Sequence, residues 1–146
     1  MLYFDTSFLV PLILAEPTSD RIQRFLSRQI AGELVISHWT RVEFSSLLAR
    51  EVRMGGLKRR TALDADAQFE ALVEESFVVL LPSADDFNLA KRFLQQYRTG
   101  LRAGDALHLA IARNHGARAI YSLDRTLGSA GRKLRLRVRT GIRQAG

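Results

Sequence analysis

The sequence of 146 residues has no cysteine, three histidines and no long uninterrupted hydrophobic segment. The absence of cysteine excludes disulfide bonds, thiolate metal sites and cysteine nucleophiles. The longest apolar run extends from Phe8 to Ala15 and contains Pro11, whereas a membrane span needs about 20 apolar residues. The first residues also lack the basic segment that is typical of an export signal. We therefore expect a cytoplasmic protein without a membrane segment.

Several catalytic signatures are missing as well. No P-loop, glycine-rich dinucleotide motif or Ser-His-Asp order is recognisable, and the shortage of histidine and cysteine argues against zinc. Charge is abundant, however, because 22 Lys and Arg residues exceed 15 Asp and Glu residues and give a net charge of +7. Such a balance favours a polyanionic partner, with nucleic acid first. A basic surface that serves solubility alone would explain it equally well.

Short β-rich runs alternate with longer segments of helical periodicity, and no repeat, linker or domain boundary interrupts them. With 47% hydrophobic residues, the chain can bury the core of a single domain that spans residues 1–146. The alternation predicts an α/β fold in which helices flank both faces of a mostly parallel sheet. The expected strands cover residues 2–4, 34–36, 77–81, 119–121 and about 134–138. One expected helix follows the first strand and ends at residue 14. The other expected helices cover about 20–29, 40–54, 58–75, 84–97 and 104–115.

Four acidic residues occur where strands end or helices begin. Asp5 directly follows the first predicted strand, and Asp124 follows the fourth. Glu43 lies in the opening turns of the helix after the second strand, and Asp105 begins its own helix. Because sites in such sheets form beyond the carboxyl ends of the strands, we expect the four acids to meet at one edge.

Each acid also has a purely structural explanation. Asp5 and Asp124 could cap the helices that follow them, and Glu43 could lie on a solvated helix face. Asp105 could interact only with the helix dipole. The helix that Asp105 begins is apolar on nearly all sides, however, and a buried carboxylate there needs a partner or a metal.

Taken together, the four acids predict a metal site. Two carboxylates about 5 Å apart repel each other by roughly 3 kcal/mol at an effective dielectric constant near 20, so four of them need protons or cations. Mg²⁺ and Mn²⁺ prefer oxygen ligands of this kind. Such a site could orient a water molecule against a phosphodiester. The acids alone do not specify RNA as the substrate.

Three further residues are candidates for roles near this site. His108 lies one turn after Asp105, so we expect it to orient that acid or to pack in the core rather than to act as a base. Glu51 shares a helix with Glu43 but lies about 12 Å further from the sheet edge. Trp39 could stack on a base or belong to the core or to a dimer contact.

The C-terminal region is strongly basic. Its cationic residues are Arg132, Lys133, Arg135, Arg137 and Arg139. Charged residues often protect an exposed sheet edge from pairing with another chain. Alternatively, these side chains could contact the phosphates of a nucleic acid that flanks the site.

The four acids lie in the segments LYFDTS (2–7), TRVE (40–43), LRAGDALHLA (101–110) and YSLDR (121–125). The order and spacing of these segments, together with the length of the chain, resemble those of the PIN-domain family, in particular the VapC toxins of bacterial toxin–antitoxin pairs. The segment around Asp105 is the most specific of the four, whereas the first would be weak evidence by itself. The resemblance extends over nearly the whole sequence.

The resemblance implies a PIN fold and Mg²⁺- or Mn²⁺-dependent endonucleolytic cleavage of RNA, often of a structured RNA such as transfer RNA. It also implies a cognate antitoxin that blocks the site, and a homodimer. The resemblance assigns metal binding and catalysis to Asp5, Glu43, Asp105 and Asp124, and supporting hydroxyl hydrogen bonds to Thr6, Ser7 and Ser122.

Two other functions remain open at this point. A Mg²⁺-dependent phosphotransfer or phosphatase domain could use a similar sheet, although Asp5 lacks a second acid close to it in sequence. A non-catalytic binding protein could use the acidic pocket to receive an arginine from a partner. Metal-dependent cleavage of RNA would distinguish the ribonuclease from both.

Overall fold

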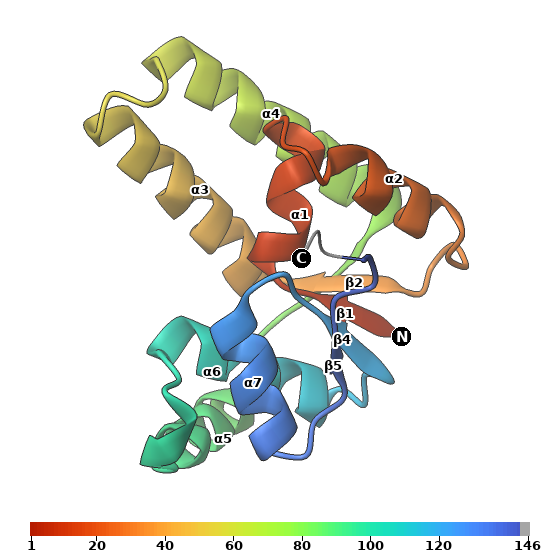
Figure 1. Ribbon diagram of the computed structural model, residues 1–146, viewed down its shortest axis with the longest axis vertical. Coiled ribbons are helices and arrows are strands. Elements are labelled where there is room, and N and C mark those ends of the chain that lie inside the picture. The colour runs from red at the N-terminus through yellow and green to blue at the C-terminus, as the bar shows by residue number, and fades with distance from the viewer. Residues whose placement is uncertain (144–146) are drawn as a thin grey trace.

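The computed structural model describes residues 1–143, in which strands and helices alternate along the chain (Figure 1). Within that range, the strands are β1 (Leu2–Phe4), β2 (Leu34–Ser37), β3 (Val78–Leu80), β4 (Ala119–Tyr121) and β5 (Val138–Arg139). The helices are α1 (Thr6–Ile13), α2 (Ser19–Ser27), α3 (His38–Arg53), α4 (Arg59–Ser76), α5 (Ala84–Leu94), the 3-10 helix η1 (Tyr97–Thr99), α6 (Ala103–Asn114) and α7 (Arg125–Lys133). The helix predicted at about 84–97 is therefore divided between α5 and η1.

All five strands run parallel in one sheet, in the order β3-β2-β1-β4-β5. β1 occupies the centre, where Leu2 lies opposite Leu34 of β2 and Ala119 of β4. Because every neighbouring pair is parallel, the carboxyl ends of all strands lie at the same edge of the sheet. The residues that directly follow β1, β2 and β4 therefore gather at that edge.

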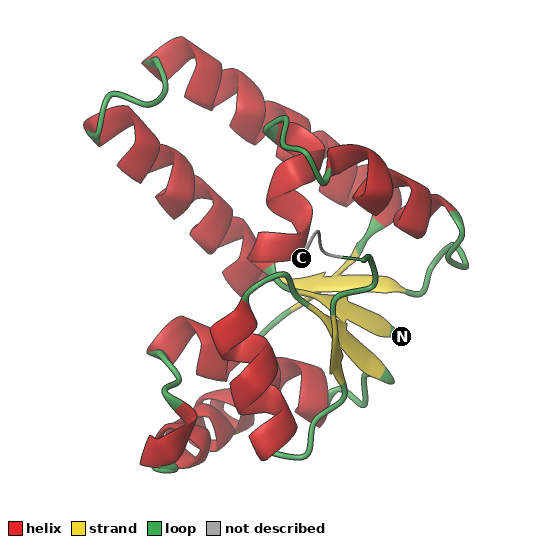
Figure 2. Ribbon diagram, in the orientation of Figure 1, coloured by secondary structure: helices red, strands yellow, loops and turns green. Residues whose placement is uncertain are grey.

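Helices cover both faces of the sheet, and the sheet separates two hydrophobic clusters (Figure 2). Leu2 and Phe4 belong to the cluster that includes α1, α2, α3 and α4, whereas Tyr3 belongs to the cluster that includes α5, α6 and α7. This alternation follows from the two-residue period of a strand. The predicted α/β fold, with helices on both faces of a parallel sheet, is confirmed.

Helices α3 and α4 form a hairpin that projects away from the sheet (Figure 1). The stacked rings of Phe44 and Phe69, with centroids 4.1 Å apart, join the two helices. At the start of α3, the Thr40 hydroxyl accepts a hydrogen bond from the Ser37 backbone N–H at 3.3 Å. This contact begins α3 directly after β2, so the second turn of α3, with Glu43, remains close to the sheet edge. Among the described helices, none combines the length and apolar character needed to cross a membrane.

The C-terminal segment differs from the predicted strand at about 134–138. The residues that follow Asp124 form α7, the helix that Asp124 was expected to cap under its structural explanation, and Arg135 then adopts a left-handed backbone conformation with φ 62°. β5 begins only at Val138, and it packs so closely on α7 that a Cβ atom at Gly131 would clash with the Val138 side chain. Glycines in α7 permit this packing but also interrupt the apolar periodicity by which a helix is recognised.

Candidate active site

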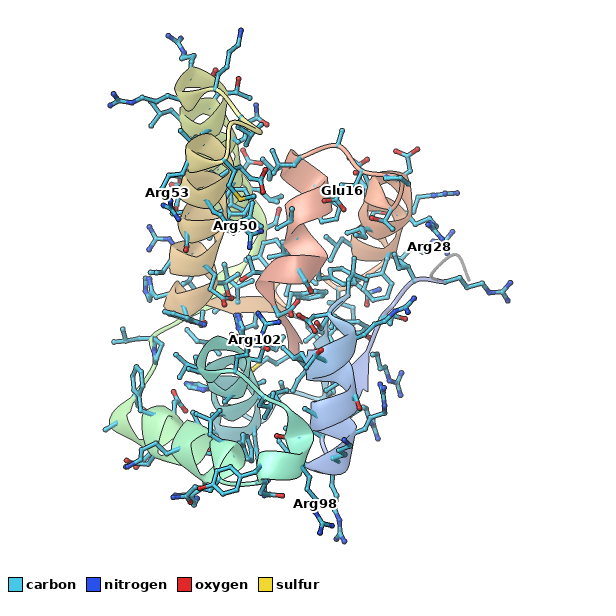
Figure 3. The ribbon with its side chains drawn as sticks, turned by 60° about the vertical axis from the view of Figure 1, so that its left-hand side comes forward. Glu16, Arg28, Arg50, Arg53, Arg98 and Arg102 are labelled. Carbon is cyan, nitrogen blue, oxygen red and sulfur yellow. The ribbon has the colours of Figure 1, made fainter. Side chains whose placement is uncertain are left out.

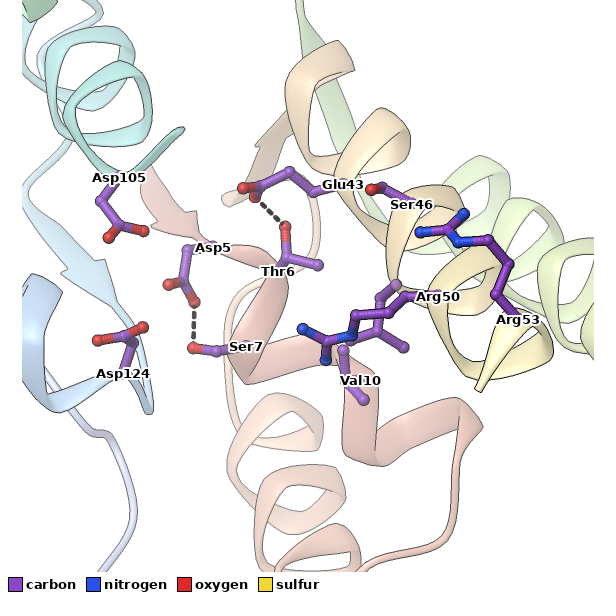
Figure 4. Close-up of a pocket in the computed structure, with 11 residues that line it drawn as sticks. Asp5, Thr6, Ser7, Val10, Glu43, Ser46, Arg50, Arg53, Asp105 and Asp124 are labelled. Atoms are coloured by element: carbon purple, nitrogen blue, oxygen red, sulfur yellow. Dashed lines mark hydrogen bonds between the residues drawn. The ribbon is translucent and has the colours of Figure 1, made fainter. Parts of the chain in front are cut away.

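The four acidic side chains predicted from the sequence line one pocket at the carboxyl edge of the sheet (Figure 4). Asp5 directly follows β1, and Asp124 lies three residues beyond β4. Glu43 lies in the second turn of α3, and Asp105 lies in the first turn of α6. Because α6 leads back to the opposite end of the sheet, where β4 begins, its first turn lies at the carboxyl edge. The topology thus brings together acids from four separate segments.

Asp5 is the most deeply buried of these acids, with 3% of its surface exposed. Its Oδ2 accepts a hydrogen bond from Ser122 Oγ at 2.6 Å, and its Oδ1 accepts from Ser7 Oγ at 2.8 Å and Phe8 N at 3.2 Å. Burial raises the pKa of Asp5 above its ordinary value, although the charge of His108 and these hydrogen bonds act in the opposite direction. The carboxyl group is therefore held in place, and a nearby cation would favour its ionised form.

Two serines join the segments that follow β1 and β4. Ser7 Oγ accepts a hydrogen bond from Leu123 N at 2.9 Å and lies 3.2 Å from Ser122 Oγ. Ser122 Oγ in turn accepts from Asp124 N at 3.0 Å. The two hydroxyls therefore couple the position of Asp5 to the position of Asp124.

Asp5 and Asp124 are also helix N-caps, so the structural explanation of these acids is correct as well. Asp5 Oδ1 accepts from Phe8 N of α1, and Asp124 Oδ1 accepts from Leu127 N of α7 at 3.0 Å. A carboxylate offers about four acceptor positions, so capping leaves others directed elsewhere. Capping thus orients both acids without removing them from the pocket.

Glu43 is held by neighbours on both sides. Its Oε1 accepts a hydrogen bond from Thr6 Oγ1 at 2.6 Å and makes a short hydrogen bond with His108 Nε2. Burial opposes ionisation, but the hydrogen bond and charge of His108, with the Thr6 hydroxyl, lower the pKa of Glu43 below its ordinary value. Gly104 leaves space for this arrangement, because a Cβ there would lie 2.8 Å from Glu43 Oε2 and 3.3 Å from the Trp39 ring.

His108 is buried in the core, which confirms one of the two roles expected for it. It forms its hydrogen bond with Glu43, however, and not with Asp105. Its Nδ1 lies 2.7 Å from Tyr3 Oη, and that hydroxyl lies 2.9 Å from Ser37 Oγ. Burial raises the pKa of Tyr3, so its hydroxyl keeps its proton and can donate to one of these neighbours. A chain of polar groups therefore runs from the end of β2 through the core to Glu43.

Asp105 shows the effect of charge crowding. Burial, followed by the negative charges of Asp124 and Glu43, raises the pKa of Asp105 to about 6, with His108 acting in the opposite direction. The neighbouring acids thus disfavour a further negative charge at this position. Either a proton or a bound cation would relieve the repulsion.

The donors in the pocket suit a hard divalent cation. Carboxylate and hydroxyl oxygens line it, whereas neither histidine nor cysteine occurs among its described lining residues. Its volume of about 380 Å³ accommodates a hydrated ion beside a phosphate group. No three acidic or histidine side chains in residues 1–143 are already arranged as a metal-binding cluster, and Glu43 is turned to Thr6 and His108. An ion would therefore draw the acids together, with water completing its coordination.

The pocket also contains two arginines that the sequence interpretation missed. Ser46, Arg50 and Arg53 follow Glu43 at intervals of three or four residues, which places them on the same side of α3, and all of them line the pocket. Figure 4 shows Arg50 directed toward the acids, with Arg53 beyond it. The helical spacing from Glu43 was a signal that could have identified them. The pocket therefore has an acidic end and a basic end.

Two other residues considered from the sequence do not line the pocket. Glu51 lies further along α3, where its carboxylate is 3.9 Å from Arg50. Trp39 is half-buried, packs against the hydrophobic cluster of α5, α6 and α7 and lies next to Gly104. Packing is therefore the explanation of Trp39 that the structure favours. Of the two α3 acids considered, only Glu43 faces the pocket.

A model of the PIN-domain family matches residues 2–133 of the chain. The chain therefore belongs to the PIN-domain family, as the four acidic segments predict. The match begins at β1 and ends with α7. A comparison with curated proteins finds no match.

Solved structures with similar folds include three bacterial proteins. VapC20 from Mycobacterium tuberculosis, described as a sarcin–ricin loop cleaving toxin, has 22% identity and a TM-score of 0.68 over 90% of this chain and 95% of that chain. FitAcB from Neisseria gonorrhoeae has 16% identity and a TM-score of 0.70 over 97% and 98% of the two chains. VapBC-1 from nontypeable Haemophilus influenzae has 18% identity and a TM-score of 0.68 over 97% of this chain and 98% of that chain. At these identities the similarity establishes the fold.

Proposed function

We propose that this protein is a metal-dependent ribonuclease of the VapC type that hydrolyses phosphodiester bonds of RNA in the carboxylate pocket. The observation that carries the proposal is that acids from four segments line one pocket in a member of the PIN-domain family. The similar VapC20 structure is described as that of a sarcin–ricin loop cleaving toxin. The net charge of +7 also favours a polyanionic substrate.

The proposed ligands of Mg²⁺ or Mn²⁺ are Asp5, Glu43, Asp105 and Asp124. A bound ion of this kind would activate a water molecule and neutralise charge on the phosphodiester. Asp5 is a preorganised ligand, because Ser7 and Ser122 hold its two oxygens. Glu43 is available as an anion at neutral pH, because His108 stabilises its ionised form.

The basic end of the pocket would bind the substrate backbone. Arg50 and Arg53 offer planar guanidinium groups that match phosphate oxygens in charge and geometry. Contacts of this type position a nucleic acid without reading its sequence. A phosphate bound there would hold the adjacent phosphodiester against the acids.

We also propose a cognate antitoxin that occupies the pocket, as the resemblance to VapC toxins implies. An acidic pocket accepts a cationic side chain from such a partner through charge-assisted hydrogen bonds. Co-purification from the native cell, together with the product of any short neighbouring reading frame, would identify the partner. A stable complex that leaves cleavage unaffected would contradict this assignment.

RNA cleavage by the purified protein tests the proposal. Wild type, Asp5→Asn and Asp105→Asn are compared in Mg²⁺, Mn²⁺ and EDTA, with Glu51→Gln as a control on α3 outside the pocket. We expect cleavage only with metal, a loss of at least about a hundred-fold in both Asn variants, and an unchanged Glu51→Gln. Equal cleavage by wild type and the Asn variants would refute the site, and absence of metal-dependent cleavage of total cellular RNA would refute the function.

A further inference from the structure

Beyond the carboxylate pocket, seven arginines line two adjoining grooves, which we call the arginine track. Asp124 lines both the carboxylate pocket and the first groove. Thr140 lines the first groove, and the next residue in the chain, Gly141, lines the second. The first groove therefore lies beside the proposed active site, and the second groove adjoins the first where Thr140 is bonded to Gly141. Its arginines are Arg125, Arg132 and Arg139 in the first groove, and Arg21, Arg24, Arg28 and Arg143 in the second.

The first groove is formed by one face of α7 beside β5. Arg125, Gly128 and Arg132 recur at intervals of three and four residues, so they share that face. Gly128 lacks a side chain, and the Arg132 guanidinium group lies beside it, with Nη1 3.4 Å from the position that a Cβ would take. Arg139 closes the groove from β5, the edge strand of the sheet.

The second groove lies along α2. Arg21, Arg24 and Arg28 recur at the same helical intervals, and Arg21 donates a hydrogen bond to the carbonyl of Arg143. Phe25, on the same face, lies against Gly141 and gives the groove an apolar floor. Figure 3 shows that the chain after β5 runs from the side of α7 toward α2, where Arg28 projects outward.

The arginines of the track have no acidic partners. None of the seven forms a salt bridge within residues 1–143, whereas Arg41 pairs with Glu70 and Arg118 with Glu33. Asp124 is the single carboxylate among the described residues that line either groove. Seven like charges without ion-pair partners, beside a single carboxylate, create a positive potential that attracts a polyanion.

We propose that the arginine track binds the RNA strand on one side of the bond to be cleaved and leads it from Asp124 around the β5 edge to α2. This proposal rests on the proposed ribonuclease function and deepens it by naming the surface that holds the substrate strand beside the cleavage site. The track passes from α7 on one face of the sheet to α2 on the other. A single strand can follow this curved path, whereas a stiff duplex would have to bend at a high cost. The apolar floor at Phe25 can also receive an unpaired base.

Fluorescence anisotropy of labelled single-stranded RNA in EDTA tests the track without any cleavage. The track variants are Arg125→Gln/Arg132→Gln/Arg139→Gln and Arg21→Gln/Arg24→Gln/Arg28→Gln. The matched control, Lys91→Gln/Arg92→Gln/Arg113→Gln, removes the same charge from exposed positions on α5 and α6. Because each phosphate contact with a single strand contributes about 0.7 to the salt slope, each track variant should lower that slope by about 2. The matching loss of affinity is about 50-fold at 0.15 M salt.

Several outcomes decide the matter. Retention of wild-type affinity by a folded track variant, or an equal loss in the control, would overturn the proposal. Equal binding of the same RNA annealed to its complement would overturn the single-stranded assignment, and preferential binding of a poly-glutamate peptide would point to an acidic protein instead. Because the two track variants alter separate helices, one remains decisive if the other fails to fold. Binding without cleavage would refute the catalytic function alone, and cleavage with unaltered binding by the variants would refute the track alone.

Discussion

The carboxylate pocket and the arginine track are built in opposite ways. In the pocket, Asp5 is buried and Glu43 is partly buried, and each accepts hydrogen bonds from at least two neighbouring groups. In the track, the guanidinium groups lie mostly at the surface and have no carboxylate partner. The pocket therefore depends on geometry, whereas the track depends on the sum of its charges. Substitutions should accordingly be strongly coupled in the first region and close to additive in the second.

The largest effect after the acids themselves is expected at His108, which positions Glu43. Replacement of a group that orients a metal ligand usually costs about 10- to 100-fold in metal affinity or activity, and we expect this loss for His108→Leu. His108→Gln retains an amide that can donate to Glu43 and should recover part of the activity. Cleavage rates and Mn²⁺ affinity measured in parallel check this prediction. If both variants lose equally and only thermal stability changes, His108 serves packing alone.

A smaller loss is expected for Gly104→Ala. The added Cβ would lie 2.8 Å from Glu43 Oε2, and Thr6 and His108 leave that carboxylate little freedom to move. Displacement of a reacting or ligating group by a fraction of an ångström should reduce cleavage by about ten-fold. Gly100→Ala does not serve as the control, because Gly100 has a positive φ. The control is Ala103→Ser, because Ala103 lies on the exposed side of the same helix turn. Equal activity of Gly104→Ala and Ala103→Ser would contradict the prediction.

In the track, a single substitution should have a modest effect. Loss of one phosphate contact with single-stranded RNA corresponds to about four-fold in affinity at 0.15 M salt. Arg139→Gln should therefore weaken RNA binding by about that factor. Addition of Arg24→Gln to this variant should weaken binding by the same factor again. A titration of each variant at several salt concentrations measures both values. Strong coupling between the two substitutions would show that the track is a geometric site instead.

The smallest effect is a pH dependence of the metal-free stability that arises in the pocket. Asp105 has a pKa of about 6 in the folded protein against an ordinary value of 3.8, so between these values the folded state binds more protons than the unfolded state. The free energy of unfolding therefore decreases as pH rises through that window. Wild type in EDTA should melt at a higher temperature at pH 5 than at pH 7, and Asp105→Asn should show less of this difference. Arg139→Gln should follow wild type, and an unchanged profile in Asp105→Asn would refute the crowding of charge.

The fold and the acids were predictable because both depend on patterns that are local in sequence. The strands Leu2–Phe4 and Ala119–Tyr121 have the predicted bounds, since each is a short apolar run between helical segments. Parallel topology then places the residues after the strands at one edge, so Asp5 and Asp124 could be assigned without knowledge of their contacts. The same reasoning located Glu43 and Asp105 through the helices that adjoin the strands.

Other features could not be derived because they depend on contacts between distant segments. His108 is closer in sequence to Asp105, yet its partners are Glu43 and Tyr3. A helix after Asp124 was anticipated only through the capping role of that residue, and the extent of α7 was not predicted because Gly128 and Gly131 break its apolar pattern. Arg50 and Arg53 are an exception, because their helical spacing from Glu43 placed them on the same side of α3 and could have identified them.

Mn²⁺ binding at pH 7 tests most directly whether the separate acids form one cation site. Electron paramagnetic resonance of free Mn²⁺ is recorded during titration of wild type, Asp5→Asn and Glu51→Gln. We predict saturable binding to wild type and Glu51→Gln, with a loss of at least about ten-fold in affinity for Asp5→Asn. Equal affinity of wild type and Asp5→Asn would contradict the account.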